Sequence, residues 1–204
     1  MKTLLLLALS CLSLLPATAD ETPNERQARR IFNQAYDKVF GEQGSSLRYD
    51  VNIIGIYKTH GTIWLKGKKQ KFIDEKVNTW NDGKTAYMAF RKKKTVEIHH
   101  ADSDKKDKYS GRFKFSPDDF TYHIASDDDG LLLTLKQKKG AKGSIKEVKA
   151  WVEKGTLVPK HLRIKVAFIW TTVKISNFQS GGITDDLFIF PRNQYKDWKF
   201  VDKR

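Results

Sequence analysis

The sequence predicts a mainly β protein with one N-terminal helix, in which a long antiparallel sheet curls around that helix. Apolar residues follow a helical period only between about residues 25 and 40, and from residue 47 onward they follow a period of two. Helical patterns do not alternate with the strands, which argues against a parallel sheet. A long antiparallel sheet twists and curls, and the helix is the element that it can wrap.

Residues 1–19 have the pattern of a secretory signal peptide. The stretch combines one Lys with a Leu-rich run and ends in Ala17-Thr18-Ala19. We therefore expect cleavage after Ala19 and a single domain over residues 20–204. The alternative, lipidation of Cys11, is disfavoured because Ala8-Leu9-Ser10 fits a lipobox poorly. Cleavage would remove Cys11, the only cysteine, so the mature chain is expected to lack a disulfide.

The helix is predicted to start at Thr22-Pro23-Asn24-Glu25. Thr22 can cap the helix, Pro23 suits its first position, and Glu25 can close a capping box. One apolar stripe then follows the spacing of a helix face, and Gly41 and Gly44 end the pattern. The stripe consists of Ala28, Ile31, Phe32, Ala35, Tyr36, Val39 and Phe40.

Ten or eleven short strands are predicted after the helix. Asn81-Asp82-Gly83 and Asp127-Asp128-Asp129-Gly130 are strong turn signals between them. The predicted strands fall in residues 47–57, 61–67, 71–80, 84–90, 95–100, 120–126, 131–139, 144–154, 162–170, 172–178 and 186–191.

The chain is strongly basic, with a formal net charge of +14. A basic surface attracts anionic partners, and the attraction weakens with salt. For an exported protein these partners are membrane headgroups, acidic glycans and acidic proteins, and we expect no nucleic-acid partner. The simplest alternative is that surface Lys residues prevent pairing between strand edges.

No set of residues predicts catalysis, and we expect neither enzymatic activity, nor a cofactor, nor a metal. Glu97, His99 and His100 could suggest metal binding, but neighbouring His residues on a strand point to opposite faces. We interpret them as surface residues. Asp127 to Asp129 lack the spacing of a calcium-binding loop and lie where a tight turn is needed.

Several strands are apolar on both faces, for example Asn52–Tyr57 and Val166–Trp170. A sheet with one wet face should alternate cleanly, so two apolar faces indicate that both are covered or that one lines a cavity. A single helix cannot cover so wide a sheet, and the sequence therefore favours a cavity over a simple core.

Three segments resemble the LolA-like periplasmic lipoprotein carriers. Gly61–Phe72 (GTIWLKGKKQKF) resembles the Trp-containing strand of the family and the turn that follows it. Trp80–Phe90 (WNDGKTAYMAF) is similar to its Asp-Gly-Lys-Thr hairpin. Asp186–Arg204 is similar to its Phe-x-Phe strand and its terminal Asp-x-Arg. At the position of the latch Arg of proteobacterial members, this sequence has Gly67.

The resemblance implies an unclosed β-barrel and a carrier that moves lipoproteins across the periplasm from the inner to the outer membrane. It implies acylated lipoproteins as cargo, an inner-membrane release complex and an outer-membrane acceptor as partners, and a monomeric protein. In this interpretation the apolar cavity is lined by Ile63, Leu65, Phe72, Trp80, Tyr87, Phe90, Leu133, Phe168 and Trp170. The basic rim that meets a partner consists of Lys66, Lys68, Lys69 and Lys71.

Two other hypotheses remain open. One is an envelope sensor on the same fold, which binds a lipid or lipoprotein in order to signal. The other is a basic envelope protein that binds anionic glycan or lipopolysaccharide through its Lys residues. Steep weakening of binding with salt would indicate the second.

Overall fold

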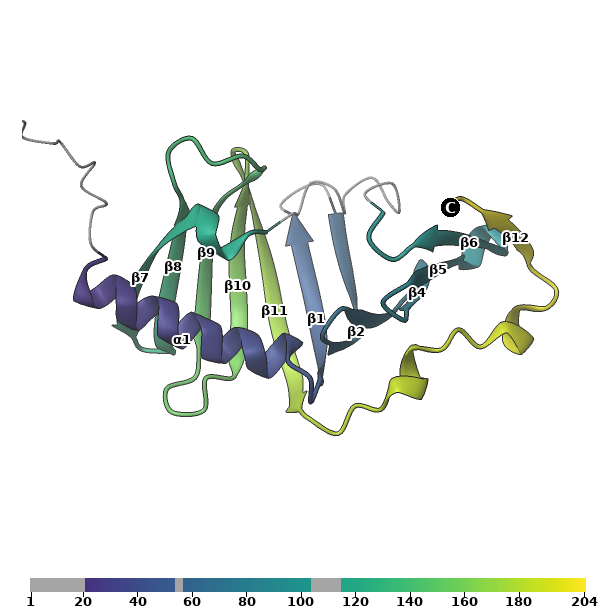
Figure 1. The fold of residues 1–204 in the computed structure, drawn as a ribbon, viewed down its shortest axis with the longest axis horizontal. Coiled ribbons are helices and arrows are strands. Elements are labelled where there is room, and N and C mark those ends of the chain that lie inside the picture. Colours follow the sequence, from purple (N-terminus) through teal and green to yellow (C-terminus); the bar gives the residue numbers. More distant parts are fainter. Residues whose placement is uncertain (1–20, 54–56, 104–114) are drawn as a thin grey trace, which may run out of the picture.

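The computed structural model describes residues 21–53, 57–103 and 115–204 of the chain (Figure 1). The predicted signal peptide lies outside these residues. The described part contains one α-helix, α1 (Pro23–Phe40), followed by strands and short 3-10 helices. The strands are β1 (Ser45–Ile53), β2 (Tyr57–Lys66), β3 (Lys69–Asp74), β4 (Val77–Asn81), β5 (Thr85–Phe90), β6 (Thr95–His100), β7 (Phe120–Asp127), β8 (Gly130–Gln137), β9 (Ile145–Val152), β10 (Pro159–Val166), β11 (Ile169–Ser180) and β12 (Lys199–Asp202).

Helix α1 begins as the sequence predicts. The backbone N–H of Glu25 donates to the Thr22 hydroxyl at 3.2 Å, and the N–H of Thr22 donates to the Glu25 carboxylate at 3.0 Å. This reciprocal capping box satisfies backbone donors that the first turn leaves free. The helix ends at Phe40 and is capped by Gly41, whose N–H donates to the Asp37 carbonyl. None of the helices in the described ranges is long and apolar enough to cross a membrane.

All described strands form one sheet that does not close on itself. Its order is β12-β6-β5-β4-β3-β2-β1-β11-β10-β9-β8-β7, with β12 and β7 at the two edges. Neighbouring strands are antiparallel, except that β12 runs parallel to β6. The predicted fold class, a curved antiparallel sheet forming an unclosed barrel with an N-terminal helix, is therefore confirmed.

The sheet has twelve strands, rather than ten or eleven, because several boundaries depend on contacts that the local sequence does not reveal. Residues 71–80 were predicted as one strand, but the Asp74 carboxylate accepts the N–H groups of Lys76 and Val77 and turns the chain. Residues 162–170 also split, into β10 and β11. The segment 186–191 was predicted as a strand, but its first half lies in the 3-10 helix η4 (Asp185–Phe188) and the rest forms no strand.

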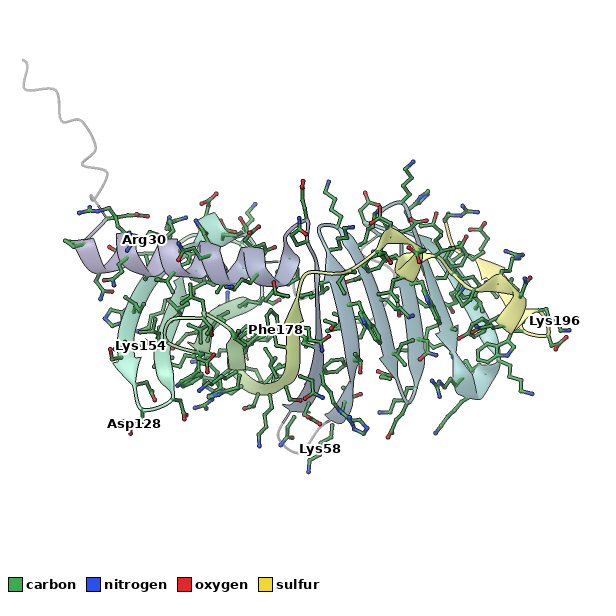
Figure 2. The ribbon with its side chains drawn as sticks, turned by 90° about the horizontal axis from the view of Figure 1, so that it is seen from below. Arg30, Lys58, Asp128, Lys154, Phe178 and Lys196 are labelled. Atoms are coloured by element: carbon green, nitrogen blue, oxygen red, sulfur yellow. The ribbon has the colours of Figure 1, made fainter. Side chains whose placement is uncertain are left out.

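The sheet is covered by different elements on its two faces. On one face, the buried cluster under α1 draws its strand residues from β7 to β10, including Tyr122, Leu133 and Leu135. On the other face, the segment after β11 runs along β3 to β6 and reaches β12 (Figure 1). There Phe190, Tyr195 and Trp198 pack against the strands in a second cluster. Figure 2 shows α1 along one half of the molecule and this C-terminal segment along the other.

Candidate functional site

The side of the sheet that faces α1 carries an apolar surface on four central strands. Cross-strand partners share a face, so the register of β11, β1, β2 and β3 defines this surface. Leu47 pairs with Ile63, which pairs with Phe72, and Tyr49 pairs with Ile175. We call this surface the inner wall. It consists of Leu47, Tyr49, Val51, Ile63, Leu65, Phe72, Val173 and Ile175.

The inner wall belongs to neither of the two packed clusters. The cluster under α1 takes its strand residues from β7 to β10, and the second takes them from β3 to β6 on the opposite face. Within the described residues, α1 reaches β1 and β2 mainly through its C-terminal end, where the Ser45 hydroxyl donates to the Val39 carbonyl. Leu47, Tyr49 and Leu65 are buried, whereas Ile63 and Phe72 are half-buried. The wall therefore offers apolar surface at the centre of the sheet.

The centre of the wall is shaped by a close contact between Tyr49 and Gly61. These residues pair across β1 and β2, and a Cβ atom at Gly61 would lie 2.8 Å from the Tyr49 hydroxyl oxygen and 2.5 Å from the Ile73 carbonyl oxygen. Glycine leaves room for the Tyr49 hydroxyl over the strand. The Tyr49 ring then contacts Phe72, with 5.4 Å between ring centroids.

A titratable pair lies farther along the same face. His99 and Glu97 alternate along β6 with Val96 and Ile98. The His99 Nε2 atom lies 3.1 Å from a carboxylate oxygen of Glu97. His99 is only 3% exposed, and its Nδ1 atom has no hydrogen-bond partner among the residues that the structure describes. The interpretation of His99 as a surface residue is therefore wrong, although His100 is exposed. Because neighbouring residues of a strand point to opposite faces, the sequence predicted that the two histidines have different surroundings. It could not show which of the two is buried.

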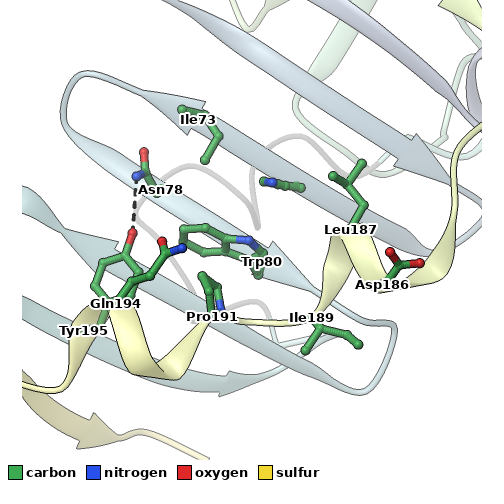
Figure 3. A pocket seen from close by; sticks show the side chains of 10 residues that line it. Ile73, Asn78, Trp80, Asp186, Leu187, Ile189, Pro191, Gln194 and Tyr195 are labelled. Carbon is green, nitrogen blue, oxygen red and sulfur yellow. Dashed lines mark hydrogen bonds between the residues drawn. The ribbon is translucent and has the colours of Figure 1, made fainter.

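Two predicted cavity residues lie on the opposite face. Trp80 pairs with Lys71 and Tyr87, so it points away from the Phe72 side of the sheet. The Phe190 ring stacks on Tyr87 at 4.5 Å and meets Trp80 edge-on at 5.4 Å. Figure 3 shows the pocket that remains between this face and the C-terminal segment. It measures about 450 Å³, and its lining includes Trp80, Ile73, Leu187 and Ile189.

The remaining predicted cavity residues are spread over the sheet. Leu133 is fully buried under α1, and Phe90 is half-buried on the inner face at the end of β5. Trp170 lies on the outer face of β11, and Phe168 is exposed in the β10–β11 turn. The structure thus brings Ile63, Leu65 and Phe72 together in the inner wall. The alternation of apolar and polar residues in 47–51 is the sequence signal that could have identified Leu47 and Tyr49 as further residues of this surface.

The predicted basic rim is partly engaged within the chain. Lys66 and Lys69 contact the two carboxylate oxygens of Asp185 at 2.9 and 2.6 Å, and their contact lowers the pKa of that carboxyl. Lys71 lies over the rings of Trp64 and Trp80, at 5.1 and 5.9 Å from the centroids, and burial lowers its pKa. Lys68 is exposed at the tip of the β2–β3 turn. Its role in partner binding stays a prediction.

The turn residue Gly67 has a clear structural role. Its φ of +53° lies in the left-handed region, which favours glycine, and its N–H donates to the Phe40 carbonyl at 2.8 Å. Gly67 thus joins the β2–β3 turn to the end of α1. In the described part of the chain, no group of three His, Cys, Asp or Glu side chains is placed to hold a metal.

Comparison with family models and with curated proteins finds no match. Solved structures do resemble the chain. An uncharacterized conserved protein from Thermus thermophilus aligns with a TM-score of 0.59 at 10% identity, over 87% of this chain and 99% of that one. This likeness shows the fold.

Two further solved structures align with lower scores. A putative outer membrane lipoprotein-sorting protein domain from Vibrio parahaemolyticus has a TM-score of 0.47 at 11% identity, over 85% of this chain and 100% of that one. A LolA superfamily protein from Nitrosomonas europaea has a TM-score of 0.40 at 9% identity, over 81% of this chain and 98% of that one.

Proposed function

We propose that this chain is an exported LolA-like carrier that shelters the acyl chains of lipoproteins on its inner wall. The observation that carries the proposal is the position of this wall: eight apolar side chains on four central strands, outside both packed clusters. The residue pattern of a signal peptide and the three resembling segments support the same function.

A carrier of this kind answers a physical problem. Three long acyl chains hold on the order of 40 methylenes, and at about 0.8 kcal/mol each their exposure to water costs on the order of 30 kcal/mol. A lipoprotein therefore needs apolar surface throughout its transit. Half-buried side chains such as Ile63 and Phe72 supply apolar surface on which an acyl chain can bind and from which it can later be released.

Transport also requires partners that load and unload the carrier. We propose an inner-membrane release complex and an outer-membrane acceptor, with the periplasm as the site of action and a monomer as the working form. Lys68 is the member of the basic rim that is exposed, and it could meet an acidic partner at the β2–β3 turn. Such a contact would tune the encounter rate more than the affinity.

The direct test places a charge on the inner wall and compares it with the same charge on the other face. Ile63→Glu and Thr62→Glu alter neighbouring half-buried positions of β2 whose side chains point to opposite faces. We expect Ile63→Glu to weaken the binding of an acylated peptide at least tenfold, because a carboxylate among apolar walls repels the chain. Thr62→Glu should bind like the parent. Fluorescence titration measures both, and circular dichroism checks that both fold.

Two results would contradict the proposal. Equal binding by both folded variants would remove the inner wall as the acyl site. Binding that falls more than tenfold between low and high salt would favour an anionic glycan instead, since apolar contacts respond weakly to salt. A sensor on the same fold would bind acyl chains equally well, but its depletion would leave lipoproteins correctly sorted.

A further inference from the structure

The turn between β10 and β11 presents an unusual apolar tip. Val166 pairs with Ile169, so Ala167 and Phe168 form a two-residue turn. Ala167 has a φ of +53°, in the left-handed region that such turns usually give to Gly or Asn. The neighbouring Phe168 is 83% exposed, the highest value among the large hydrophobic side chains in the described residues. A strained turn that exposes a phenyl ring indicates a function rather than a contribution to folding.

Cations surround the strand positions next to this tip. Arg163, Lys165 and Lys149 all lie over the Trp170 ring, at 5.0, 5.8 and 5.9 Å from its centroid. Of the described acids, Glu147 forms an ion pair with this group, and its carboxylate lies 3.9 Å from Lys149. The group therefore keeps a net positive charge around an amphipathic indole.

More positive charge comes from the adjacent loop between β8 and β9. The N–H of Ala167 donates to the Ser144 carbonyl at 3.0 Å, which holds this loop beside the turn at one end of these strands (Figure 1). The loop carries the exposed residues Lys138, Lys139 and Lys142. At the other end of β8, the turn into the strand carries Asp127, Asp128 and Asp129. Charge is thus distributed unevenly between the two ends of these strands.

We propose that this end of the strands docks the protein on the surface of an anionic lipid bilayer. Phe168 enters the boundary between headgroups and acyl chains, and Trp170 lies at the headgroup level, where indole rings are favoured. The Lys and Arg residues around them bind anionic headgroups, and each cation near the surface adds to the attraction. We call the β10–β11 turn and the β8–β9 loop, with Lys149, Arg163, Lys165 and Trp170, the docking edge.

A lipid surface fits the docking edge better than an acidic glycan does. A glycan needs the cations and a ring to stack on, but it gives no reason to expose Phe168 in a strained turn. A bilayer binds both the cations and the exposed Phe168 ring, since either of them alone attaches a protein only weakly to a membrane. The inference does not depend on acyl-chain binding by the inner wall, and a sensor or a carrier could each use it.

The test measures co-sedimentation of the purified protein with phosphatidylcholine vesicles, with and without phosphatidylglycerol. Only the anionic vesicles should bind. Phe168→Ser should weaken this binding about tenfold, because the ring no longer leaves water. The double variant Arg163→Gln/Lys165→Gln should weaken it more than tenfold, and added salt should weaken the parent strongly.

Matched controls carry the same changes elsewhere on the surface. Ile189→Ser removes another exposed apolar side chain, 65% exposed in the C-terminal segment. Lys196→Gln/Lys203→Gln removes two exposed charges, one of which Figure 2 shows at the end of the molecule away from α1. Both controls should bind vesicles like the parent.

Three results would overturn the inference. The first is no binding to anionic vesicles by the parent. The second is an equal loss of vesicle binding in the control variants. That result would show that binding depends on charge or apolar surface anywhere on the protein and not on the docking edge. The third is binding to a sulfated polysaccharide that requires Arg163 and Lys165 while vesicle binding ignores Phe168, which would identify a glycan surface.

Discussion

At the scale of single residues, Gly61 decides how the inner wall is built. Its missing side chain leaves room for the Tyr49 hydroxyl and the Ile73 carbonyl, and the latter belongs to backbone that cannot move aside freely. We expect Gly61→Ala to destabilise the fold by about 1–3 kcal/mol, as overpacking of a tight site does. Thr62→Ala, next to it on the other face, should cost less. Urea unfolding measures both, and equal stability of Gly61→Ala and the parent would refute the close contact.

At the scale of elements, the C-terminal segment is fastened to the sheet by Asp185. Contacts with Lys69 and Lys66 lower the pKa of this carboxyl, so the attachment is present above the usual pKa of Asp and is lost as the pH falls through the lowered value. At pH values below the usual pKa of Asp, we expect the amides of residues 183–190 to exchange faster, relative to their intrinsic rates and to the β8 amides, than they do at neutral pH. Asp185→Asn should produce the faster exchange already at neutral pH. The neighbouring Asp186→Asn should not, and identical exchange in both variants would contradict the fastening role.

The elements also show what could be predicted from sequence. The capping box at Thr22 and the turn at Asn81-Asp82-Gly83 act locally, so the helix start and the β4–β5 hairpin were predictable. The turn at Ala167-Phe168 carries no turn residue and was missed. The strand predicted in residues 186–191 was wrong because contacts of Asp185 with distant lysines and burial of Phe188 determine that segment.

The candidate site was predictable only in part, for a related reason. Alternation along a strand separates two faces, but it does not show which one an element from elsewhere in the chain will cover. Ile63, Leu65 and Phe72 share the inner wall, whereas Trp80 and Tyr87 lie on the opposite face under Phe190. The C-terminal segment, which follows these strands by more than one hundred residues, determines which face is covered.

At the scale of the whole molecule, one sheet is shared between two coverings that lie on opposite faces. Helix α1 covers β7 to β10, and the C-terminal segment covers β3 to β6 from the other side. Strands β11, β1, β2 and β3 carry the inner wall, and the docking edge lies at the ends of β8 to β11. In our account, a lipid-binding wall and a membrane-docking edge therefore occupy the same sheet.

The most direct test of the central claim locates the acyl chain on the protein. A peptide with a diazirine-bearing acyl chain would be photo-crosslinked to the purified protein, and the modified residues identified by mass spectrometry. We predict crosslinks at inner-wall residues, above all the half-buried Ile63 and Phe72, and their loss when unlabelled acylated peptide competes. Competable crosslinks confined to the opposite pocket, at Trp80, Leu187 and Ile189, would contradict the account.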